Sequence, residues 1–327
     1  MASYQRNGMT VVNDVLTKYA VANQSAPERE LVVPEGVVAI AADAFSQNRV
    51  GITKLTLPAS FARFDANAFS SSCLNSVSVS SANKKFKVQC GCLIDVTTST
   101  LVLASNSFFS VSTPHGDSVK HERNDFFNTS VYLMNYIVPS VKYIGNRAFA
   151  YISPRAAYAI TLPKGLFSIG AESFFCAKIC GAILPDSLTS IGPRAFKGSG
   201  LFTIDIPQSV TTLGDEAFGG CRGLGFVSIR GEIKNWGKNI FDSTGNSQTQ
   251  MTIKSTSVGD RALGNYSGKI HLTAALKSLG ERALGRPCLI YTHTTLAQWN
   301  AVRKGKDNVY TYVRCTDGKT GSGGYHL

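Results

Sequence analysis

The feature that most constrains the fold of this chain is a short segment that recurs along most of its length. Six copies contain a proline, a turn, an aliphatic residue and a closing phenylalanine, as in TLPKGLFSIGAESF (161–174) and ILPDSLTSIGPRAF (183–196). The closing positions are Phe45, Phe69, Phe149, Phe174, Phe196, Phe218 and Phe241, followed by Leu263 and Leu284. Apart from one step of 80 residues, successive closing positions are 21 to 25 residues apart. A fixed period of this length predicts a solenoid of stacked repeats.

Each repeat predicts two strands joined by a turn. The residues before the proline alternate between apolar and polar, as in Ile204-Asp205-Ile206, which is the pattern of a half-buried strand. Proline then ends the strand because it has no N–H to donate. A second apolar pair, such as Leu188 and Ile191, predicts a short second strand. The glycine that follows in seven copies predicts either a positive φ or close packing against the neighbouring repeat.

A single repeat cannot bury its own apolar side, so its neighbours must cover it. We therefore expect an all-β-rich solenoid of right-handed stacked repeats of about 22–24 residues, with a hairpin insertion and short terminal caps. The closing phenylalanines would stack along the core as a spine. Two ordinary β domains separated by the insertion are the alternative.

The predicted organisation is one continuous solenoid domain. Its regions are an N-terminal hairpin cap (1–30), repeats 1–2 (31–80), a hairpin and irregular loop insertion (81–135), repeats 3–9 (136–289), a C-terminal cap with a tryptophan-bearing helix (290–318) and a flexible tail (319–327). In the insertion, KFKVQ, CLIDV and TLVLA predict strands, with a turn at Cys90-Gly91, and Asn13-Asp14 predicts a similar turn. The loop aromatics Phe108, Phe109, Phe126 and Phe127 are expected to anchor the loop, or else to form a binding edge.

The repeat pattern L-x-L-P-x-S-V-x-x-I-G-x-x-A-F-x-x-C-x-x-L resembles that of the BspA-like leucine-rich repeat family of bacterial surface and secreted proteins. The resemblance covers about residues 11–316 and includes the opening VVNDVLTKY, the hairpin insertion at 77–102 and the closing segment at 290–318. It implies a leucine-rich-repeat solenoid that mediates adhesion or host-protein binding, often at the cell surface or outside the cell. It brings no catalytic residues with it.

Charge and hydropathy narrow the possible partners. The net charge is +12, but the basic residues are scattered, and the densest run (Arg303, Lys304 and Lys306) has no aromatic stacking platform beside it. Specific nucleic-acid binding is therefore not expected, whereas docking onto acidic cell-surface polymers is compatible with such a surface. No apolar run is long enough to span a membrane. Polar residues interrupt 9–22, so no signal peptide is expected and a cytoplasmic location is the alternative.

The reactive side chains do not form a recognisable catalytic motif, and no cofactor is predicted. Cys73, Cys176, Cys180 and Cys221 fall where a free thiol would act as a small core residue. Cys90, Cys92, His115 and His121 are the one set that resembles a zinc site, but their spacing is not a standard one. His271, His293 and His326 have no acid or nucleophile partner in sequence, so an enzyme is not expected.

A binding surface would instead be built from outward positions that recur in each repeat. The candidate residues are Tyr143, Phe167, Arg63, Lys142, Thr161, Asp205 and His271. Tyr143 and Phe167 stand out because exposed aromatic side chains often dominate binding energy, although both would otherwise widen the cover of the core. The predicted function is non-enzymatic, adhesin-type binding of a host or bacterial surface protein or glycan. A cytoplasmic interaction scaffold of the same fold is the alternative, and the oligomeric state is left open.

Overall fold

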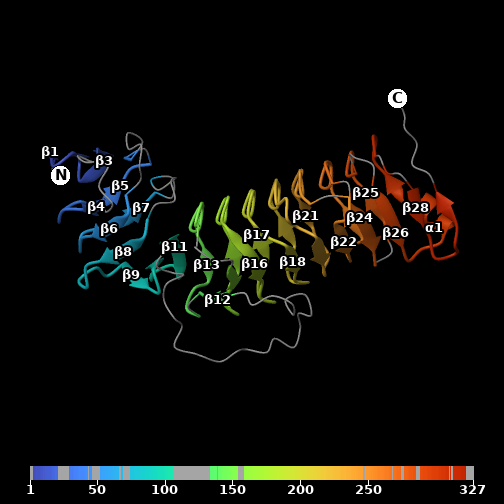
Figure 1. Ribbon diagram of the computed structural model, residues 1–327, viewed down its shortest axis with the longest axis horizontal. Helices are drawn as coiled ribbons and strands as arrows, with labels where there is room; N and C mark the ends of the chain where they lie inside the picture. Colours follow the sequence, from blue (N-terminus) through green and yellow to red (C-terminus); the bar gives the residue numbers. More distant parts are fainter. Residues whose placement is uncertain are drawn as a thin grey trace.

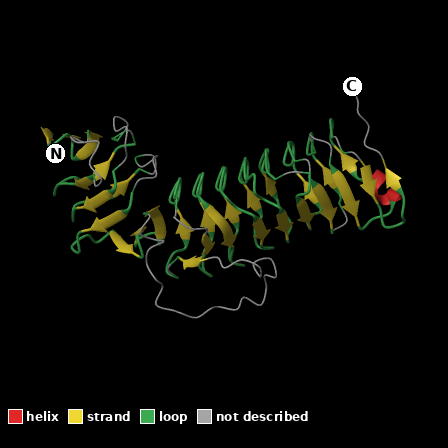
Figure 2. Ribbon diagram, viewed as in Figure 1, coloured by secondary structure: helices red, strands yellow, loops and turns green. Residues whose placement is uncertain are grey.

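The chain forms an elongated solenoid with its termini at opposite ends (Figure 1). The computed structural model describes residues 3–20, 29–42, 44–45, 52–65, 68, 74–105, 133–137, 139–153, 158–245, 247–266, 268–273, 276–284, 288–308, 310 and 312–321. Strands and turns follow one another along the solenoid, and the one described helix lies at its C-terminal end (Figure 2). Phe69, Cys73, His115, His121, His326 and the four loop aromatics lie outside the described residues.

From residue 133 onward, the first strand of each repeat joins a ten-stranded sheet, which we call the long-strand sheet. Its order is β12 (Leu133–Tyr136), β14 (Tyr158–Thr161), β16 (Ile179–Ile183), β18 (Thr203–Ile206), β20 (Phe226–Ile229), β22 (Gln250–Ile253), β24 (Lys269–Leu272), β26 (Leu289–Thr292), β28 (Tyr312–Arg314) and β29 (Thr320–Gly321). All pairs are parallel except β28 with β29. The burial of β18, β20, β22 and β24 alternates as the sequence predicts.

The second strand of each repeat is only two residues long, and these strands form the opposite side of the solenoid. One sheet contains β21 (Asn235–Trp236), β19 (Thr212–Leu213), β17 (Ser190–Ile191), β15 (Ser168–Ile169), β13 (Tyr143–Ile144), β11 (Thr100–Ala104), β10 (Cys92–Asp95) and β9 (Phe86–Gln89). A further sheet contains β23 (Ser257–Val258), β25 (Ser278–Leu279) and β27 (Arg303–Lys304).

The N-terminal repeats have two sheets of their own. One contains β1 (Tyr4–Arg6), β2 (Met9–Val12), β3 (Val15–Tyr19), β5 (Ala39–Ile40) and β7 (Arg63–Phe64), and the other contains β4 (Glu30–Val32), β6 (Lys54–Leu57) and β8 (Ser76–Val79). The predicted turn at Asn13-Asp14 joins β2 to β3, and both residues have positive φ, at 50° and 64°. Two consecutive positive φ values are typical of the tight turns that match strand twist.

The predicted aromatic spine is present in the larger part of the core. The rings of Phe149, Phe174, Phe196, Phe218 and Phe241 stack with centroid separations of 4.8, 4.9, 5.3 and 5.2 Å. All five side chains are buried. The separations match the spacing of neighbouring strands, because each ring is carried by one repeat. Phe45 is not in this stack: it is half-buried and meets Tyr19 edge-on at 6.3 Å.

The glycine that recurs after the short strand is required by packing and not by its φ angle. A Cβ on Gly214 would lie 2.3 Å from the Pro193 nitrogen, and a Cβ on Gly237 would lie 2.4 Å from the Asp215 nitrogen. The left-handed conformation falls two residues later, where Glu216 has φ of 54°. Of the two readings of the glycine that the sequence left open, close approach between repeats is therefore correct at these positions.

The hairpin of the insertion forms a wall between two hydrophobic clusters. The three predicted strands are present as β9, β10 and β11, and Cys90 and Gly91 form the predicted turn with φ of 50° and 72°. Every residue of β10 is buried. Cys92 and Ile94 pack into the cluster of the later repeats, while Leu93 packs into the cluster of the first repeats. The division of the chain into domains stays a prediction.

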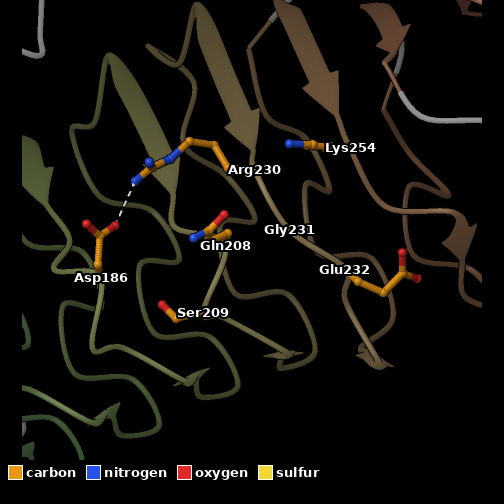
Figure 3. A pocket seen from close by; sticks show the side chains of 7 residues that line it. All are labelled: Asp186, Gln208, Ser209, Arg230, Gly231, Glu232 and Lys254. Atoms are coloured by element: carbon orange, nitrogen blue, oxygen red, sulfur yellow. Dashed lines mark hydrogen bonds and ion pairs between the residues drawn. The ribbon is translucent and has the colours of Figure 1, made fainter.

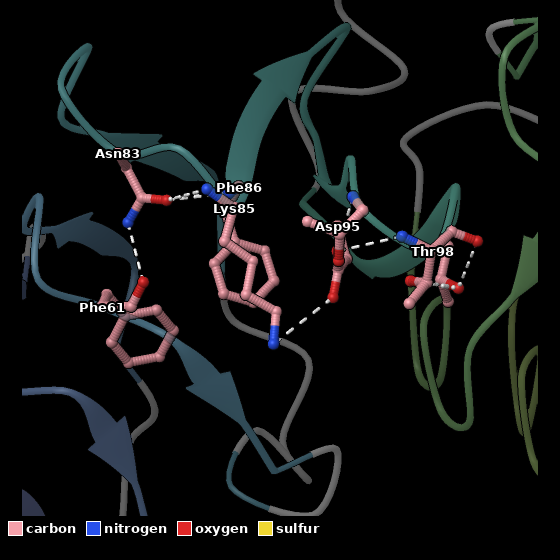
Figure 4. Close-up of polar contacts among 8 residues, drawn as sticks. Phe61, Asn83, Lys85, Phe86, Asp95 and Thr98 are labelled. Atoms are coloured by element: carbon pink, nitrogen blue, oxygen red, sulfur yellow. Dashed lines mark hydrogen bonds and ion pairs between the residues drawn. The ribbon is translucent and has the colours of Figure 1, made fainter.

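Polar side chains anchor this hairpin (Figure 4). The Asn83 amide nitrogen donates hydrogen bonds to the carbonyl oxygens of Pro58, Ala59 and Phe61, at 3.0, 3.2 and 2.8 Å. The Asn83 side-chain oxygen accepts from the Lys85 and Phe86 amides at 2.9 and 2.8 Å. One asparagine thus ties the turn before β9 to the preceding repeat.

Asp95 organises the far end of the same hairpin. One of its oxygens accepts hydrogen bonds from the Thr97 and Thr98 amides at 2.9 and 3.3 Å. Its other oxygen pairs with the Lys85 ammonium at 3.7 Å. These contacts fix the turn that leads from β10 into β11, against which β13 pairs in parallel.

The C-terminal end is closed by helix α1 (Leu296–Ala301), as the spacing of Leu296, Trp299 and Val302 predicts. Thr295 caps the helix and forms a reciprocal capping box with Gln298. Trp299 is buried in the main hydrophobic cluster, so it covers the last repeat. The Lys304 ammonium donates to the Trp299 carbonyl at 2.6 Å, and burial lowers the pKa of this lysine.

Candidate binding surface

The short strands present a regular surface, which we call the short-strand face. In each repeat from β13 to β25, the two residues before the last residue of the short strand are exposed or half-buried, and that last residue is aliphatic except at Trp236. The last short strand, β27, consists of the exposed Arg303 and of Lys304. The face consists of residues 142–143, 167–168, 189–190, 211–212, 234–235, 256–257, 277–278 and Arg303. Most of these residues are serine, threonine, asparagine or lysine, so the face is polar and rich in hydroxyl groups.

An aromatic pair stands out on this polar face. Tyr143 and Phe167 are 43% and 45% exposed, and their ring centroids are 6.1 Å apart. The Lys142 ammonium lies 5.8 Å from the centre of the Phe167 ring. The structure thus brings together three of the residues singled out in the sequence, and it places the two aromatic rings outward.

Three other candidates lie on the opposite side of the solenoid, on the long-strand sheet. Thr161, Asp205 and His271 are all half-buried. Asp205 is ion-paired with the Arg230 guanidinium at 3.1 Å, so its charge is locally balanced. These residues therefore do not share one surface with Tyr143 and Phe167.

His271 packs against a neighbouring aromatic side chain of the same sheet. Its ring stacks on that of Tyr291 with centroids 4.7 Å apart. Burial lowers the pKa of His271, and the nearby charges of Lys269 and His293 lower it further. The imidazole is therefore mainly neutral at neutral pH. Arg63, the remaining candidate, lies on β7 in the N-terminal repeats, where it is exposed and apart from both groups.

The sequence reasoning missed a polar groove at the turns between long and short strands (Figure 3). It is a hollow of about 580 Å³. The lining residues are Asp186, Gln208, Ser209, Arg230, Gly231, Glu232 and Lys254. Arg230 bridges Asp186 at 3.3 Å and Asp205 at 3.1 Å, while Lys254 is exposed.

The groove lies beside a shortened repeat. Five residues separate Ile253 from Gly259, whereas seven separate Ile206 from Gly214. Glu232 bridges to the shortened turn by accepting hydrogen bonds from the Thr256 amide at 2.7 Å and the Ser255 hydroxyl at 3.1 Å. Burial raises the pKa of the Glu232 carboxyl, but these hydrogen bonds outweigh it, and the pKa is below its usual value. The turn between Ile253 and Gly259 is two residues shorter than its counterpart, and this difference is visible in the sequence.

The cysteines that the structure describes are free thiols. Burial raises the pKa of Cys221 to about 11 and that of Cys288 to about 12, so both are protonated and unreactive at neutral pH. Cys92 is buried in the core, and its proposed zinc partners His115 and His121 lie outside the described residues. Within the described ranges, no three His, Cys, Asp or Glu side chains are grouped as metal ligands would be.

A family model of the BspA type leucine rich repeat region matches residues 25–109, 120–248 and 189–304 of this chain. The crystal structure of the pneumococcal vaccine antigen PcpA is similar to it, with a TM-score of 0.58 and 18% identity over 86% of this chain and 67% of that one. A leucine-rich repeat protein from Eubacterium ventriosum has a TM-score of 0.45 and 15% identity over 76% of this chain and 56% of its own. No curated protein matches the chain. Across the described ranges, no helix has the length and apolarity needed to cross a membrane.

Proposed function

This chain belongs to the BspA type leucine-rich repeat family, and we propose that it is a non-enzymatic, adhesin-type protein that binds a surface protein or glycan through its short-strand face. Repeat proteins of this kind bind their partners on extended surfaces, because each stacked repeat adds equivalent outward positions. The polar, hydroxyl-rich composition of the face suits a partner that is itself hydrated.

The observation that carries this proposal is the exposed pair of Tyr143 and Phe167. Two neighbouring aromatic rings that are more than two-fifths exposed do not cover the core. Large aromatic side chains contribute most of the binding energy in many interfaces, with polar neighbours forming the rim. The pair lies within a polar sheet surface, which matches this arrangement.

We further propose that the protein acts at the cell surface or outside the cell. The solved PcpA structure, a pneumococcal vaccine antigen, supports this location because it has a similar fold.

A pull-down tests the proposal. The immobilised protein is exposed to host extracellular-matrix extract and, in parallel, to bacterial lysate. We expect salt-resistant capture of a specific matrix or surface component by the wild-type protein. The Tyr143→Ala/Phe167→Ala variant should weaken this capture by at least about thirtyfold, the loss typical of one hot-spot residue.

Phe202 provides a matched control, since it is 50% exposed but lies outside the short-strand face. The Phe202→Ala variant should capture the same component as the wild-type protein. If Phe202→Ala weakens capture as much as the Tyr143→Ala/Phe167→Ala variant, the short-strand face is not the binding surface. Capture from bacterial lysate alone would refute an adhesin role and favour an internal scaffold.

A further inference from the structure

The positive charge of this protein is concentrated in its C-terminal third. Residues 222–319 contain 15 Lys and Arg against 6 Asp and Glu, so they carry +9 of the net charge of +12. A charge excess on one part of a surface raises the local concentration of anionic partners and speeds their association. Binding of an anionic partner therefore depends more on where these cations lie in the fold than on the total net charge.

Part of this excess lies on the short-strand face. Lys234 and Lys277 directly precede β21 and β25, Arg303 begins β27, and all three side chains are exposed. No position of the face carries an acidic residue. Within the described part of the chain, no ion pair joins any of these three cations to an acid. At the strand spacing of about 5 Å, the three cations span about 15 Å.

The nearby acidic side chains are largely committed to the fold. Glu232 lies against the face at Thr256 and Ser257: it accepts hydrogen bonds from the Thr256 amide and from the Ser255 and Ser257 hydroxyls, so it offsets one of the three cations. The Asp260 carboxylate accepts the Glu281 amide at 2.8 Å, and Asp307 is ion-paired with Arg282 at 2.9 Å. Asp260, Glu281 and Asp307 belong to the turns that follow the short strands, not to the face itself. The face therefore keeps a net positive charge that its own repeats do not cancel.

We propose that this end of the short-strand face, Lys234, Lys277 and Arg303, binds a linear acidic polysaccharide. The inference rests on the proposed function, because it takes the short-strand face as the binding surface and names the chemistry of one ligand. The cations would pair with sulfate or carboxylate groups. The intervening residues, such as Asn235 and Ser278, offer donors and acceptors that match sugar hydroxyl groups.

The surroundings of these cations favour a polysaccharide over other polyanions. Single-stranded nucleic acid is held by aromatic side chains on which its bases stack, and residues 211–212, 234–235, 256–257 and 277–278 include none. An anionic membrane would require apolar side chains that insert beside the cations, and these positions offer none.

Heparin immobilised on a biosensor surface is the probe, with neutral dextran as the reference. The full-length protein should bind heparin at low and at physiological salt, and should not bind dextran. The Lys234→Glu/Lys277→Glu/Arg303→Glu variant should bind at least about tenfold more weakly, as expected when three exposed ion pairs are lost. All three side chains are exposed, so the substitutions should leave the fold intact, and circular dichroism checks this.

A second triple variant separates the face from the total charge. Lys87, Lys164 and Lys178 are exposed and belong to earlier parts of the solenoid than Lys234, Lys277 and Arg303, and Lys87→Glu/Lys164→Glu/Lys178→Glu changes the net charge by the same amount. This variant should retain heparin binding to within about twofold. Equal loss in both variants, no heparin binding by the wild-type protein, or tighter binding to single-stranded DNA or anionic vesicles would each overturn the proposal.

The two proposals fail separately. Loss of heparin binding with continued capture of a matrix component through Tyr143 and Phe167 would refute only the polysaccharide inference. Heparin binding through the cationic end of the face, with capture of matrix components unaffected by Tyr143→Ala/Phe167→Ala, would refute only the binding role of the aromatic pair.

Discussion

Replacing Phe196 with leucine tests whether the aromatic spine stabilises the solenoid by stacking as well as by burial. Phe196 lies between Phe174 and Phe218, with centroid separations of 4.9 and 5.3 Å and interplanar angles of 2° and 3°. Leucine keeps most of the apolar volume and already occupies the same position in two later repeats, as Leu263 and Leu284. The substitution therefore removes ring contacts while leaving little cavity.

The expected magnitude follows from the number of ring neighbours. A stacked aromatic pair contributes about 0.5–1.5 kcal/mol beyond its buried area, so Phe196→Leu should lower the free energy of unfolding by about 1–3 kcal/mol. Phe241 has one stacked neighbour, Phe218, and is followed by Leu263. Phe241→Leu should therefore cost about 0.5–1.5 kcal/mol. The alanine variants at both positions should cost about 3–5 kcal/mol each, because both side chains are fully buried.

Urea unfolding followed by far-ultraviolet circular dichroism measures these differences. The slope of the transition should be compared among variants, because a solenoid can unfold in segments and a single free energy is meaningful only if the slope is unchanged. Equal costs for Phe196→Leu and Phe241→Leu would refute the reasoning, since the two sites are equally buried and differ in their ring neighbours. The ladder would then contribute through burial alone.

Two further predictions concern the turn after each short strand and the protonation of His271. Gly214→Ala should lower the free energy of unfolding by about 1–3 kcal/mol, because its Cβ would lie 2.3 Å from the Pro193 nitrogen. Arg261→Gly should leave the free energy of unfolding unchanged or raise it by up to about 1 kcal/mol, because Arg261 has φ of 55°, which glycine adopts without strain. If thermal unfolding showed the Arg261→Gly variant to be less stable than the Gly214→Ala variant, the glycine would not be required at position 214. His271 has a lowered pKa, so its contribution to stability is present above the ordinary histidine pKa of about 6.5 and is lost as the pH falls through the lower folded value. The wild-type protein should therefore lose more stability than His271→Gln between about pH 7.5 and about pH 5, and an equal loss in urea titrations would show that another group is responsible.

The local features of each repeat were predictable from the residues themselves. Alternation around Asp205 placed Ile204 and Ile206 in the core, and the fixed period predicted the stack of Phe149 to Phe241. The turn at Cys90-Gly91 followed from its position between two apolar runs. These predictions succeeded because strand periodicity and repeat spacing are properties of neighbouring residues.

The candidate site was predictable only in part. The sequence singled out Tyr143 and Phe167 and placed them on adjacent repeats, and the structure shows them side by side and exposed. The sequence also assigned Thr161, Asp205 and His271 to the first strand of their repeats, but it could not show that the two strands of a repeat lie on opposite sides of the solenoid, because that depends on how the turn between them folds. It also missed the groove, which depends on how Glu232 of one repeat meets the shortened turn of the next.

The sequence by itself therefore determined the solenoid, the inward residues and the order in which the strands stack, because each repeat packs mainly against its neighbours along the chain. The tertiary structure alone decided how repeats meet. It shows that Gly214 is required by contact with Pro193, whereas Glu216 adopts the left-handed conformation. It also shows that β10 separates two hydrophobic clusters. These features depend on distances between atoms of different repeats, which a repeating pattern of residue types does not specify.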